Sequence, residues 1–292
     1  MKRRQQNPPT PGKEFAPSAA AGRRAGTGKD RRVVTALARG LAILRAFESS
    51  SDRLGNGEIA QRTGLPKPTV SRLTYTLTQL GYLSYFEERE QYALGSAVMA
   101  LGMAFFRANS FPQTARPFLQ SLADEVQCVV ALFQRDGLDC VVVKLFTGAT
   151  QNIAVQLTVG SRVPIDGAIT GMAMIAALPV QERARLLATL RRRNGARWPE
   201  LQARIERASA DLRARGYATG IGLWHKDINS ISTPLFAQES GELYVVSVSG
   251  PAFITGEKVL RERVGPRLVA TTEEMCRLDL CQRPLIAPAA RS

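Results

Sequence analysis

The residues best suited to contact a partner lie between positions 67 and 80, where hydrogen-bonding side chains recur at helical spacing. One side of the predicted helix is apolar and carries Val70, Leu73, Leu77 and Leu80. The other side carries short or flat, mostly uncharged side chains: Thr69, Ser71, Arg72, Tyr75, Thr76 and Gln79. A helix that enters the DNA major groove uses this set, because Arg pairs with guanine, Gln with adenine, and Ser or Thr with phosphates. The pattern favours DNA binding over a solvated helix face, on which Glu and Lys are more common.

Two short helices and a tight turn must position this polar face. The first helix, residues 58–63, is predicted to end at Gly64, because glycine tolerates the left-handed backbone of a helix end. The second helix has Pro68 in its first turn, where no N–H is needed, and is expected to end at Gly81. The spacing predicts a helix-turn-helix.

A hairpin follows the second helix. Two strand-like runs, residues 82–86 and 91–94, flank a polar turn that contains Arg89 among three glutamates. The combination predicts a winged helix-turn-helix on double-stranded DNA. We expect four side chains to face the groove, namely Ser71, Arg72, Tyr75 and Gln79, and three to lie near phosphates, namely Lys67, Thr69 and Arg89.

The same stretch resembles the isocitrate lyase regulator (IclR) family of transcription factors. The resemblance is carried by Glu58-Ile59-Ala60, Thr63-Gly64-Leu65-Pro66-Lys67-Pro68-Thr69-Val70, Leu80-Gly81-Tyr82-Leu83 and Tyr92-Ala93-Leu94-Gly95, and it extends over roughly Val33 to Leu280. It implies a homodimer or homotetramer on a pseudo-palindromic operator. It also implies a GAF-like α+β domain that binds a small organic acid as effector.

Composition and hydropathy predict the domain organisation. Residues 1–30 are rich in Pro, Gly, Ala and basic residues and are expected to form a disordered tail. The other parts are a DNA-binding domain at 31–95, a linker helix at 96–110, an effector-binding domain at 111–282 and a tail at 283–292. The linker is strongly apolar, so we expect it to pack against a second subunit or against the second domain. In the DNA-binding domain, an amphipathic helix over residues 33–47 is expected to pack beneath the two helices of the helix-turn-helix.

The second domain is predicted to be α+β, with antiparallel strands and helices at the ends. Strands are expected at 128–133, 138–146, 153–157, 217–223, 229–236 and 243–249, and long helices at 180–193, 199–215 and 257–279. Residues 160–171 are expected to be a loop that leads into an apolar helix. The Arg191–Arg193 run is interpreted as a solvated face, and a second DNA contact is a weaker alternative.

Small residues at a predicted helix start mark a candidate effector site. Ala168, Ile169, Thr170 and Gly171 lie where free backbone N–H groups and the helix dipole favour an anion such as a carboxylate. A tight loop-to-helix junction that needs small residues for packing is an equally good explanation. Two pairs of hydroxyls, Ser230 with Ser232 and Ser247 with Ser249, are each two residues apart on a strand and share a face. They could line a polar cavity or bond across strands. The resemblance assigns all eight residues to the effector site.

One departure from the family pattern leaves the effector undefined. The family has an acidic cluster after the Gly-Tyr pair, whereas Gly216-Tyr217 is followed here by Ala218-Thr219-Gly220-Ile221-Gly222. Trp224 could line a pocket for an aromatic ligand, or it could be a core residue. The resemblance implies a small organic acid, aromatic acids included, but its identity cannot be carried over from the family.

Charge and cysteine content limit the remaining possibilities. The net charge is +14, and residues 1–94 contribute 16 basic and 8 acidic side chains, which suits a polyanionic partner. The four cysteines do not form a disulfide framework, and no metal, cofactor or membrane partner is expected. We expect a cytoplasmic protein that is not an enzyme. The alternatives are a DNA-binding protein without a ligand and, with less support, an enzyme on an α+β sensor fold.

Overall fold

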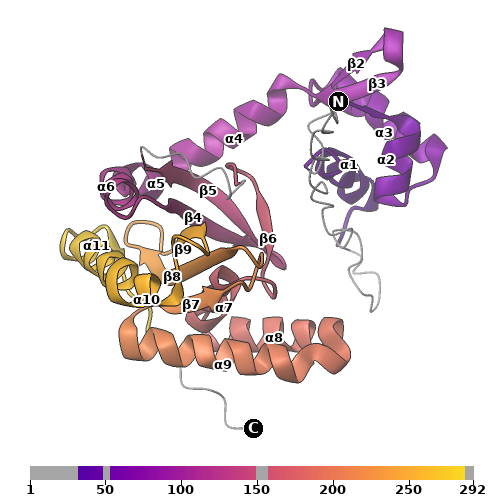
Figure 1. Ribbon diagram of the computed structural model, residues 1–292. Coiled ribbons are helices and arrows are strands. Elements are labelled where there is room, and N and C mark those ends of the chain that lie inside the picture. Colours follow the sequence, from indigo (N-terminus) through magenta and orange to yellow (C-terminus); the bar gives the residue numbers. More distant parts are fainter. Residues whose placement is uncertain (1–31, 49–52, 149–156, 287–292) are drawn as a thin grey trace, which may run out of the picture. The chain divides into compact units, whose positions relative to one another are not determined.

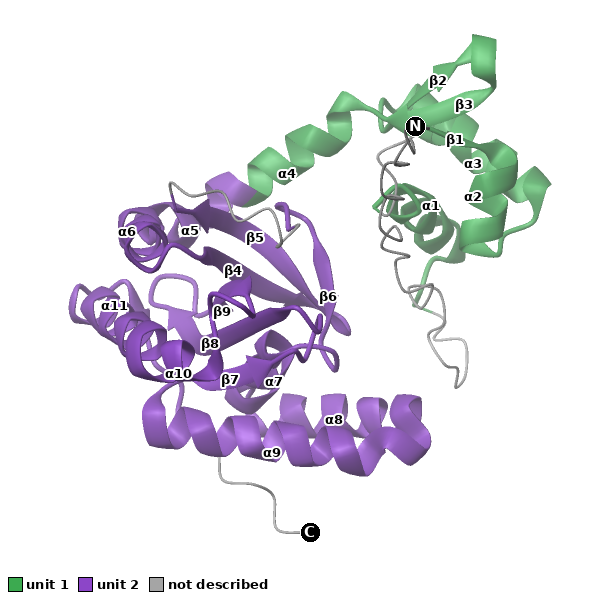
Figure 2. Cartoon of the chain, viewed as in Figure 1, with its two compact units in different colours: residues 1–105 green, residues 106–292 purple. Residues whose placement is uncertain are grey.

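A computed structural model describes residues 32–48, 53–148 and 157–286 of the chain. The chain divides into two compact units, residues 1–105 and 106–292 (Figure 2). Several expectations lie outside the described residues: the tail at 1–30, most of the strand at 153–157, and the last residues of the C-terminal tail. The domain boundaries given above stay a prediction.

The first unit is a winged helix-turn-helix (Figure 1). Its elements are α1 (Thr35–Arg45), β1 (Leu54–Gly55), α2 (Asn56–Thr63), α3 (Lys67–Gln79), β2 (Leu83–Phe86), the 3-10 turn η1 (Glu87–Arg89) and β3 (Gln91–Leu94). The strands form an antiparallel sheet in the order β1-β3-β2. A small core joins the helices to the sheet and is built from Ile43, Phe47, Leu54, Ile59, Val70, Leu83 and Tyr92.

Helix α1 differs from expectation in the face that it buries. Ile43 and Phe47 enter the core, but Val34, Leu37 and Leu41 are 64%, 63% and 53% exposed. The helix carries two apolar stripes, and only one of them packs beneath α3. Leu80 was also expected to anchor α3, but it lies one residue beyond the helix and is 61% exposed.

Helix α4 (Ser96–Ala108) follows the wing and has no buried residue. Met99, Leu101 and Met103 are 68%, 58% and 50% exposed. The predicted helix is confirmed, and within the described chain nothing buries this part of its apolar surface.

The second unit contains a seven-stranded sheet in which every paired strand is antiparallel. The order is β10-β8-β9-β4-β5-β6, and β7 pairs with β8. The strands are β4 (Val129–Asp136), β5 (Asp139–Thr147), β6 (Arg162–Pro164), β7 (Ala218–Ile221), β8 (Ile228–Ala237), β9 (Leu243–Pro251) and β10 (Cys281–Gln282). The two short edge strands β6 and β10 were not predicted; β6 lies where a loop was expected.

Helices cover both faces of this sheet (Figure 1). One face packs against α5 (Phe111–Thr114), α6 (Arg116–Val126) and α11 (Gly265–Arg277), with α10 (Glu257–Val259) and the π-helical turn η3 (Leu260–Val264) leading into α11. The other face packs against α7 (Ile169–Ala177), which is backed by α8 (Val180–Asn194), η2 (Gly195–Arg197) and α9 (Trp198–Arg215). The predicted fold class, a winged helix-turn-helix followed by an α+β domain, is confirmed.

Candidate DNA-contacting face and effector site

Turn chemistry fixes where the recognition helix α3 begins. Gly64 ends α2 in the left-handed conformation, at φ 68°, and its N–H donates to the Ala60 carbonyl at 2.9 Å. Pro66 precedes α3 with extended backbone, and Pro68 lies in the first turn, where its missing N–H costs nothing. Gly81, where the second helix was expected to end, is also left-handed, at φ 76°. The two helices are therefore joined as the sequence indicated.

The inner side of α3 is fixed by one apolar and one polar side chain. Val70 and Thr74 are fully buried. The Thr74 hydroxyl lies 3.0 Å from the Val70 carbonyl oxygen and 3.3 Å from Oδ1 of Asn56 in α2. Because a buried hydroxyl must be paired, this contact helps to hold α2 and α3 in one geometry. This contact could not be predicted from the sequence, because Thr74 is one of four threonines in α3, with Thr69, Thr76 and Thr78.

The outer side of α3 is available to a partner. Ser71, Arg72, Tyr75 and Gln79 are exposed, and Tyr75 is 66% exposed. None of these four side chains forms a hydrogen bond or ion pair with another described residue. Thr76 also points outward, but its hydroxyl donates to the Arg72 carbonyl at 2.9 Å, so it is not a first choice for a base contact.

The residues expected near phosphates occupy two places. Lys67 and Thr69 lie in the first turn of α3, where Lys67 is exposed and Thr69 half-buried. Arg89 is exposed on the wing, between the exposed carboxylates of Glu87, Glu88 and Glu90. The wing tip is therefore negative on balance and would repel a phosphate backbone.

Aromatic contacts stiffen the wing below its tip. The Tyr85 and Tyr92 rings lie 4.8 Å apart, on directly opposed residues of β2 and β3. The Arg53 guanidinium lies 3.5 Å from the centre of the Phe86 ring, a cation–π contact. Arg53 is an exposed cation next to the wing that the sequence did not single out.

In the second unit, three hydroxyls predicted for the effector site form one chain beneath α7. The Thr170 and Ser232 oxygens lie 3.3 Å apart, and Ser232 donates to Ser247 at 3.0 Å. Ser247 in turn lies 3.3 Å from the Ile231 carbonyl oxygen. All three side chains are at most 5% exposed. Cross-strand bonding, the alternative to a polar cavity, therefore holds for Ser232 and Ser247.

Strand register brings the other two serines to the same face. Ser230 pairs with Ser249, and Ser232 with Ser247, in the ladder between β8 and β9. Ser230 is buried, whereas Ser249 is half-buried. Side chains two residues apart share a face, so the four serines form one polar patch on the side that α7 covers.

The N-terminus of α7 lies in the interior next to this patch. Ala168 precedes the helix and has no side-chain oxygen to cap it. Ala168 and Ile169 are each 4% exposed. The first N–H groups of any helix have no earlier carbonyl to bind, and their dipole favours an anion. The four residues at 168–171 and the serine patch are thus brought together.

Close packing sets the position of this helix end. A Cβ on Gly171 would lie 1.9 Å from the Ile165 carbonyl oxygen, and one on Gly220 would lie 2.8 Å from Cβ of Ile169. Side chains cannot be accommodated at either glycine without movement of the backbone or of Ile169. For Gly171, the structure thus supports the packing explanation for the small residue.

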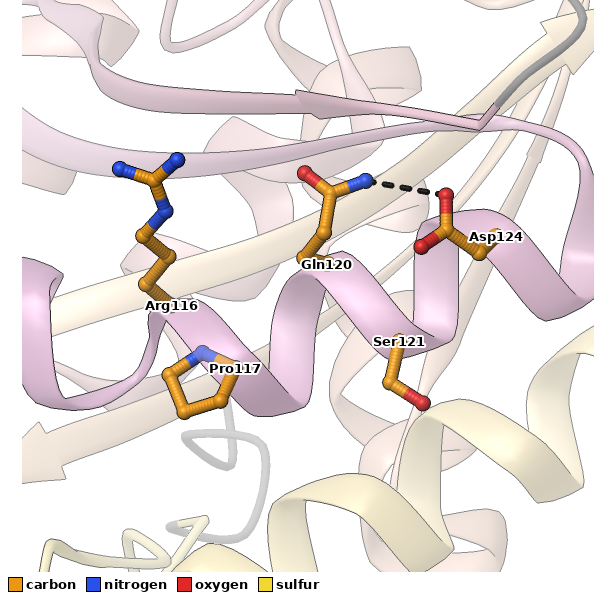
Figure 3. A pocket seen from close by; sticks show the side chains of 5 residues that line it. All are labelled: Arg116, Pro117, Gln120, Ser121 and Asp124. Atoms are coloured by element: carbon orange, nitrogen blue, oxygen red, sulfur yellow. Dashed lines mark hydrogen bonds between the residues drawn. The ribbon is translucent and has the colours of Figure 1, made fainter.

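The hollow drawn in Figure 3 is not at the predicted site. It has a volume of about 410 Å³ and is lined by Arg116, Pro117, Gln120, Ser121 and Asp124. All five residues belong to α6, and Gln120 donates to Asp124 at 3.0 Å. Side chains of a single helix do not converge on a ligand from several sides, as a binding site requires. The serine patch is the better candidate.

Positive charge in the second part of the chain is concentrated in α8 and α9. Residues 180–215 contain 10 arginines and 4 acidic residues, whereas the rest of residues 95–292 contains 13 basic and 13 acidic residues.

Within the described ranges, no helix has the length and apolar character needed to span a bilayer. Nor do the described residues bring together three or more His, Cys, Asp or Glu side chains that could hold a metal ion.

A winged helix-turn-helix with a free polar recognition face, followed by an α+β domain with a buried polar patch, defines the class of DNA-binding transcriptional regulators. Comparison with known families agrees: residues 36–85 match the IclR helix-turn-helix domain, and residues 107–277 match the C-terminal domain of bacterial IclR transcriptional regulators. The chain belongs to the IclR family. The matched families and relatives are regulators, not enzymes.

Similar proteins extend over most of the chain. The HTH-type transcriptional regulator TsaQ1/TsaQ2 of Comamonas testosteroni is 30% identical over 244 residues, covering 83% of this chain and 87% of that protein. The crystal structure of an IclR family transcriptional regulator from Brucella abortus has a TM-score of 0.77 at 38% identity, covering 87% of this chain and 96% of that chain. An IclR homolog from Microbacterium hydrocarbonoxydans, crystallised with 4-hydroxybenzoate, shares the fold with a TM-score of 0.64 at 17% identity, covering 84% of this chain and 98% of that chain.

Proposed function

We propose that two-fold-related copies of this regulator bind a pseudo-palindromic operator, and that a small organic acid in the second unit changes their DNA affinity. The observation that carries the proposal is the division of α3 into two sides. Its inner side is buried and hydrogen-bonded to α2, while its outer side presents unpaired polar groups. Such a regulator acts on the chromosome, in the cytoplasm.

The base contacts are assigned to the exposed stripe of α3. Arg72 has the reach and the paired donors to bind O6 and N7 of guanine, and Gln79 can bind the N6 and N7 edge of adenine. Ser71 and Tyr75 lie on the same exposed side. Lys67, Thr69 and Arg89 contact phosphates. The negative charge of the glutamates beside Arg89 weakens the attraction of that residue for phosphate.

Apolar stripes on α1 and α4 support a homodimer or homotetramer. Leu37 and Leu41 in α1, and Met99 and Met103 in α4, are all at least 50% exposed. Each stripe follows helical spacing, so a second copy could cover it along its length. A two-fold pair of recognition helices then meets two half-sites. Sedimentation at several concentrations measures the assembly.

The effector is assigned to the polar patch beneath α7. A carboxylate would accept from the N–H groups of Ile169 and Thr170 at the uncapped helix end. The hydroxyls of Thr170, Ser232 and Ser247 would bind the remaining polar atoms of the acid. Because these hydroxyls are bonded to one another in this structure, the ligand must exchange their mutual hydrogen bonds for its own. The aromatic acid held by the Microbacterium homolog supports an aromatic ligand for this fold.

The test is a fluorescence anisotropy titration of labelled DNA from upstream of the gene, with and without a panel of aromatic and aliphatic acids that includes 4-hydroxybenzoate. We expect one class of acids to shift the DNA affinity of the wild-type protein and Ser247→Ala to abolish the shift. Ser209→Ala is the matched control, because Ser209 is also fully buried and donates to a backbone carbonyl, that of Ile205, at 2.8 Å. An undiminished shift in Ser247→Ala would place the effector elsewhere.

A DNA-binding protein without a ligand is the second candidate, favoured by the mutual bonding of the buried hydroxyls. It predicts specific operator binding that no acid in the panel changes, and thermal unfolding that no acid shifts. These two results together would replace the effector proposal and leave the DNA-binding assignment intact.

A further inference from the structure

Two cysteines meet where the last long helix turns back to the sheet. Cys276 is in the last turn of α11, and Cys281 is the first residue of β10. Their sulfur atoms lie 3.1 Å apart. The five-residue spacing gave no sign of this pair, because the intervening residues leave a helix, reverse direction and enter a strand.

Backbone hydrogen bonds hold the reversal in one conformation. The Leu280 N–H donates to the Met275 carbonyl, and the Asp279 N–H donates to the Cys276 carbonyl, both at 3.1 Å. Asp279 between them has φ 54°, in the left-handed region. This pattern is a Schellman motif, which ends a helix in a defined geometry. The main chain, and not only the choice of rotamer, therefore brings the two sulfurs together.

The strand on the far side of the reversal is also fixed. Cys281 pairs with Ala237 of β8, and the Gln238 N–H donates to the Leu280 carbonyl at 3.0 Å. Cys281 is 2% exposed, whereas Cys276 is half-buried and can be reached from solvent. Burial, with the hydrogen bond to Cys276 as a smaller cause, raises the pKa of Cys281. Cys276 is thus placed to react first with a reagent from solvent, and the buried Cys281 is placed to react afterwards with the modified Cys276.

The other two cysteines lack this arrangement. Cys128 and Cys140 are buried, and burial raises their pKa to about 11 and about 12. The Cys128 thiol lies 3.3 Å from the Val126 carbonyl oxygen, and both cysteines are free. They serve as internal references for an unreactive buried thiol.

We propose that Cys276 and Cys281 form a reversible disulfide by exchange with a low-molecular-weight disulfide such as oxidised glutathione. The Cys276 thiolate attacks one sulfur of oxidised glutathione and displaces one glutathione thiolate, which takes up a proton. Cys281 then loses its proton, attacks the Cys276 sulfur and displaces the second glutathione. Two protein thiols are oxidised, and one disulfide is reduced to two thiols.

The bridge would tie β10 covalently to α11. β10 lies at one edge of the order β10-β8-β9-β4-β5-β6, and its partner β8 carries Ser230 and Ser232. The modification would therefore hold α11 against β10, the neighbour of the strand that bears part of the polar patch. It is independent of the proposed effector and does not involve the DNA-contacting face.

The experiment uses the full-length protein, reduced and freed of reductant, and then incubated with oxidised glutathione. Free thiols are alkylated under denaturing conditions, and the protein is analysed by intact mass and peptide mapping. We expect two of the four thiols to be lost to alkylation, a mass lower by two hydrogen atoms before alkylation, and a linked peptide pair containing Cys276 and Cys281. Reduction should restore four alkylatable thiols.

Variants separate the two steps. Cys281→Ser should stop at a mixed disulfide of Cys276 with one glutathione, whereas Cys276→Ser should keep Cys281 unmodified. Cys128→Ser is the matched control and should still form the bridge. Recovery of four free thiols from the oxidised wild-type protein, or glutathione attached separately to both cysteines without a linked peptide, would overturn the proposal.

Discussion

Replacing Arg72 by Ala should weaken operator binding while leaving the protein as stable as before. The Arg72 side chain is exposed and forms no hydrogen bond or ion pair with a described residue, so its removal should change the free energy of unfolding by less than about 0.5 kcal/mol. A bidentate contact with guanine contributes about 1–3 kcal/mol of discrimination, or roughly 5- to 150-fold per half-site. The proposed two-fold dimer would lose this contact twice, so the operator should be affected more strongly than random DNA.

Loss of one positive charge would also weaken binding to any DNA, so a control for charge is needed. Arg185→Ala removes the same charge from an exposed position on α8. Anisotropy titrations on operator and random duplexes at several salt concentrations should show a lower ratio of operator to random affinity for Arg72→Ala alone. An equal loss on both duplexes would make Arg72 a phosphate contact, and no loss on either would refute its place in the interface.

Three further predictions concern the wing, α7 and α4. Glu88→Gln should tighten binding to random DNA by up to about fivefold at low salt, because it removes a charge that repels phosphate, and the gain should vanish in high salt. Gly171→Ala should lower the free energy of unfolding by about 1–3 kcal/mol or more, since its Cβ would overlap the Ile165 carbonyl oxygen; unchanged thermal unfolding would contradict that packing. Met99→Ser together with Met103→Ser should weaken self-association at least tenfold, as measured by sedimentation, because burying a Met side chain contributes about 1.5–3 kcal/mol. An unchanged dimer would show that the interface does not include this part of α4.

Local chemistry allowed the DNA-binding unit to be predicted closely. Gly64 and Gly81 mark helix ends because few other residues adopt positive φ easily, and the structure has both in that conformation. Pro68 places the start of α3 to within one residue. The outward face of α1 could not be predicted, since Leu37 and Leu41 look like core residues until the fold shows that a second stripe fills the core.

Features that depend on distant contacts were not accessible from the sequence. The strands β6 and β10 contain three and two residues, too few to show an alternating pattern, and exist because a neighbouring strand offers hydrogen-bonding groups. The serine patch was located by the spacing of Ser230, Ser232, Ser247 and Ser249. Only the register of β8 and β9 shows which hydroxyls bond to one another.

The uneven charge of the second unit affects how this regulator must be studied. Residues 180–215 hold the whole positive excess of residues 95–292, in α8, η2 and α9, and the two long helices pack side by side (Figure 1). Heparin is a sulfated, negatively charged column matrix, so it would retain the protein through residues 180–215 whether or not the recognition helix were intact. Retention on heparin therefore cannot stand in for operator recognition, and purified variants of α3 should elute with the unaltered protein even when they have lost all sequence preference.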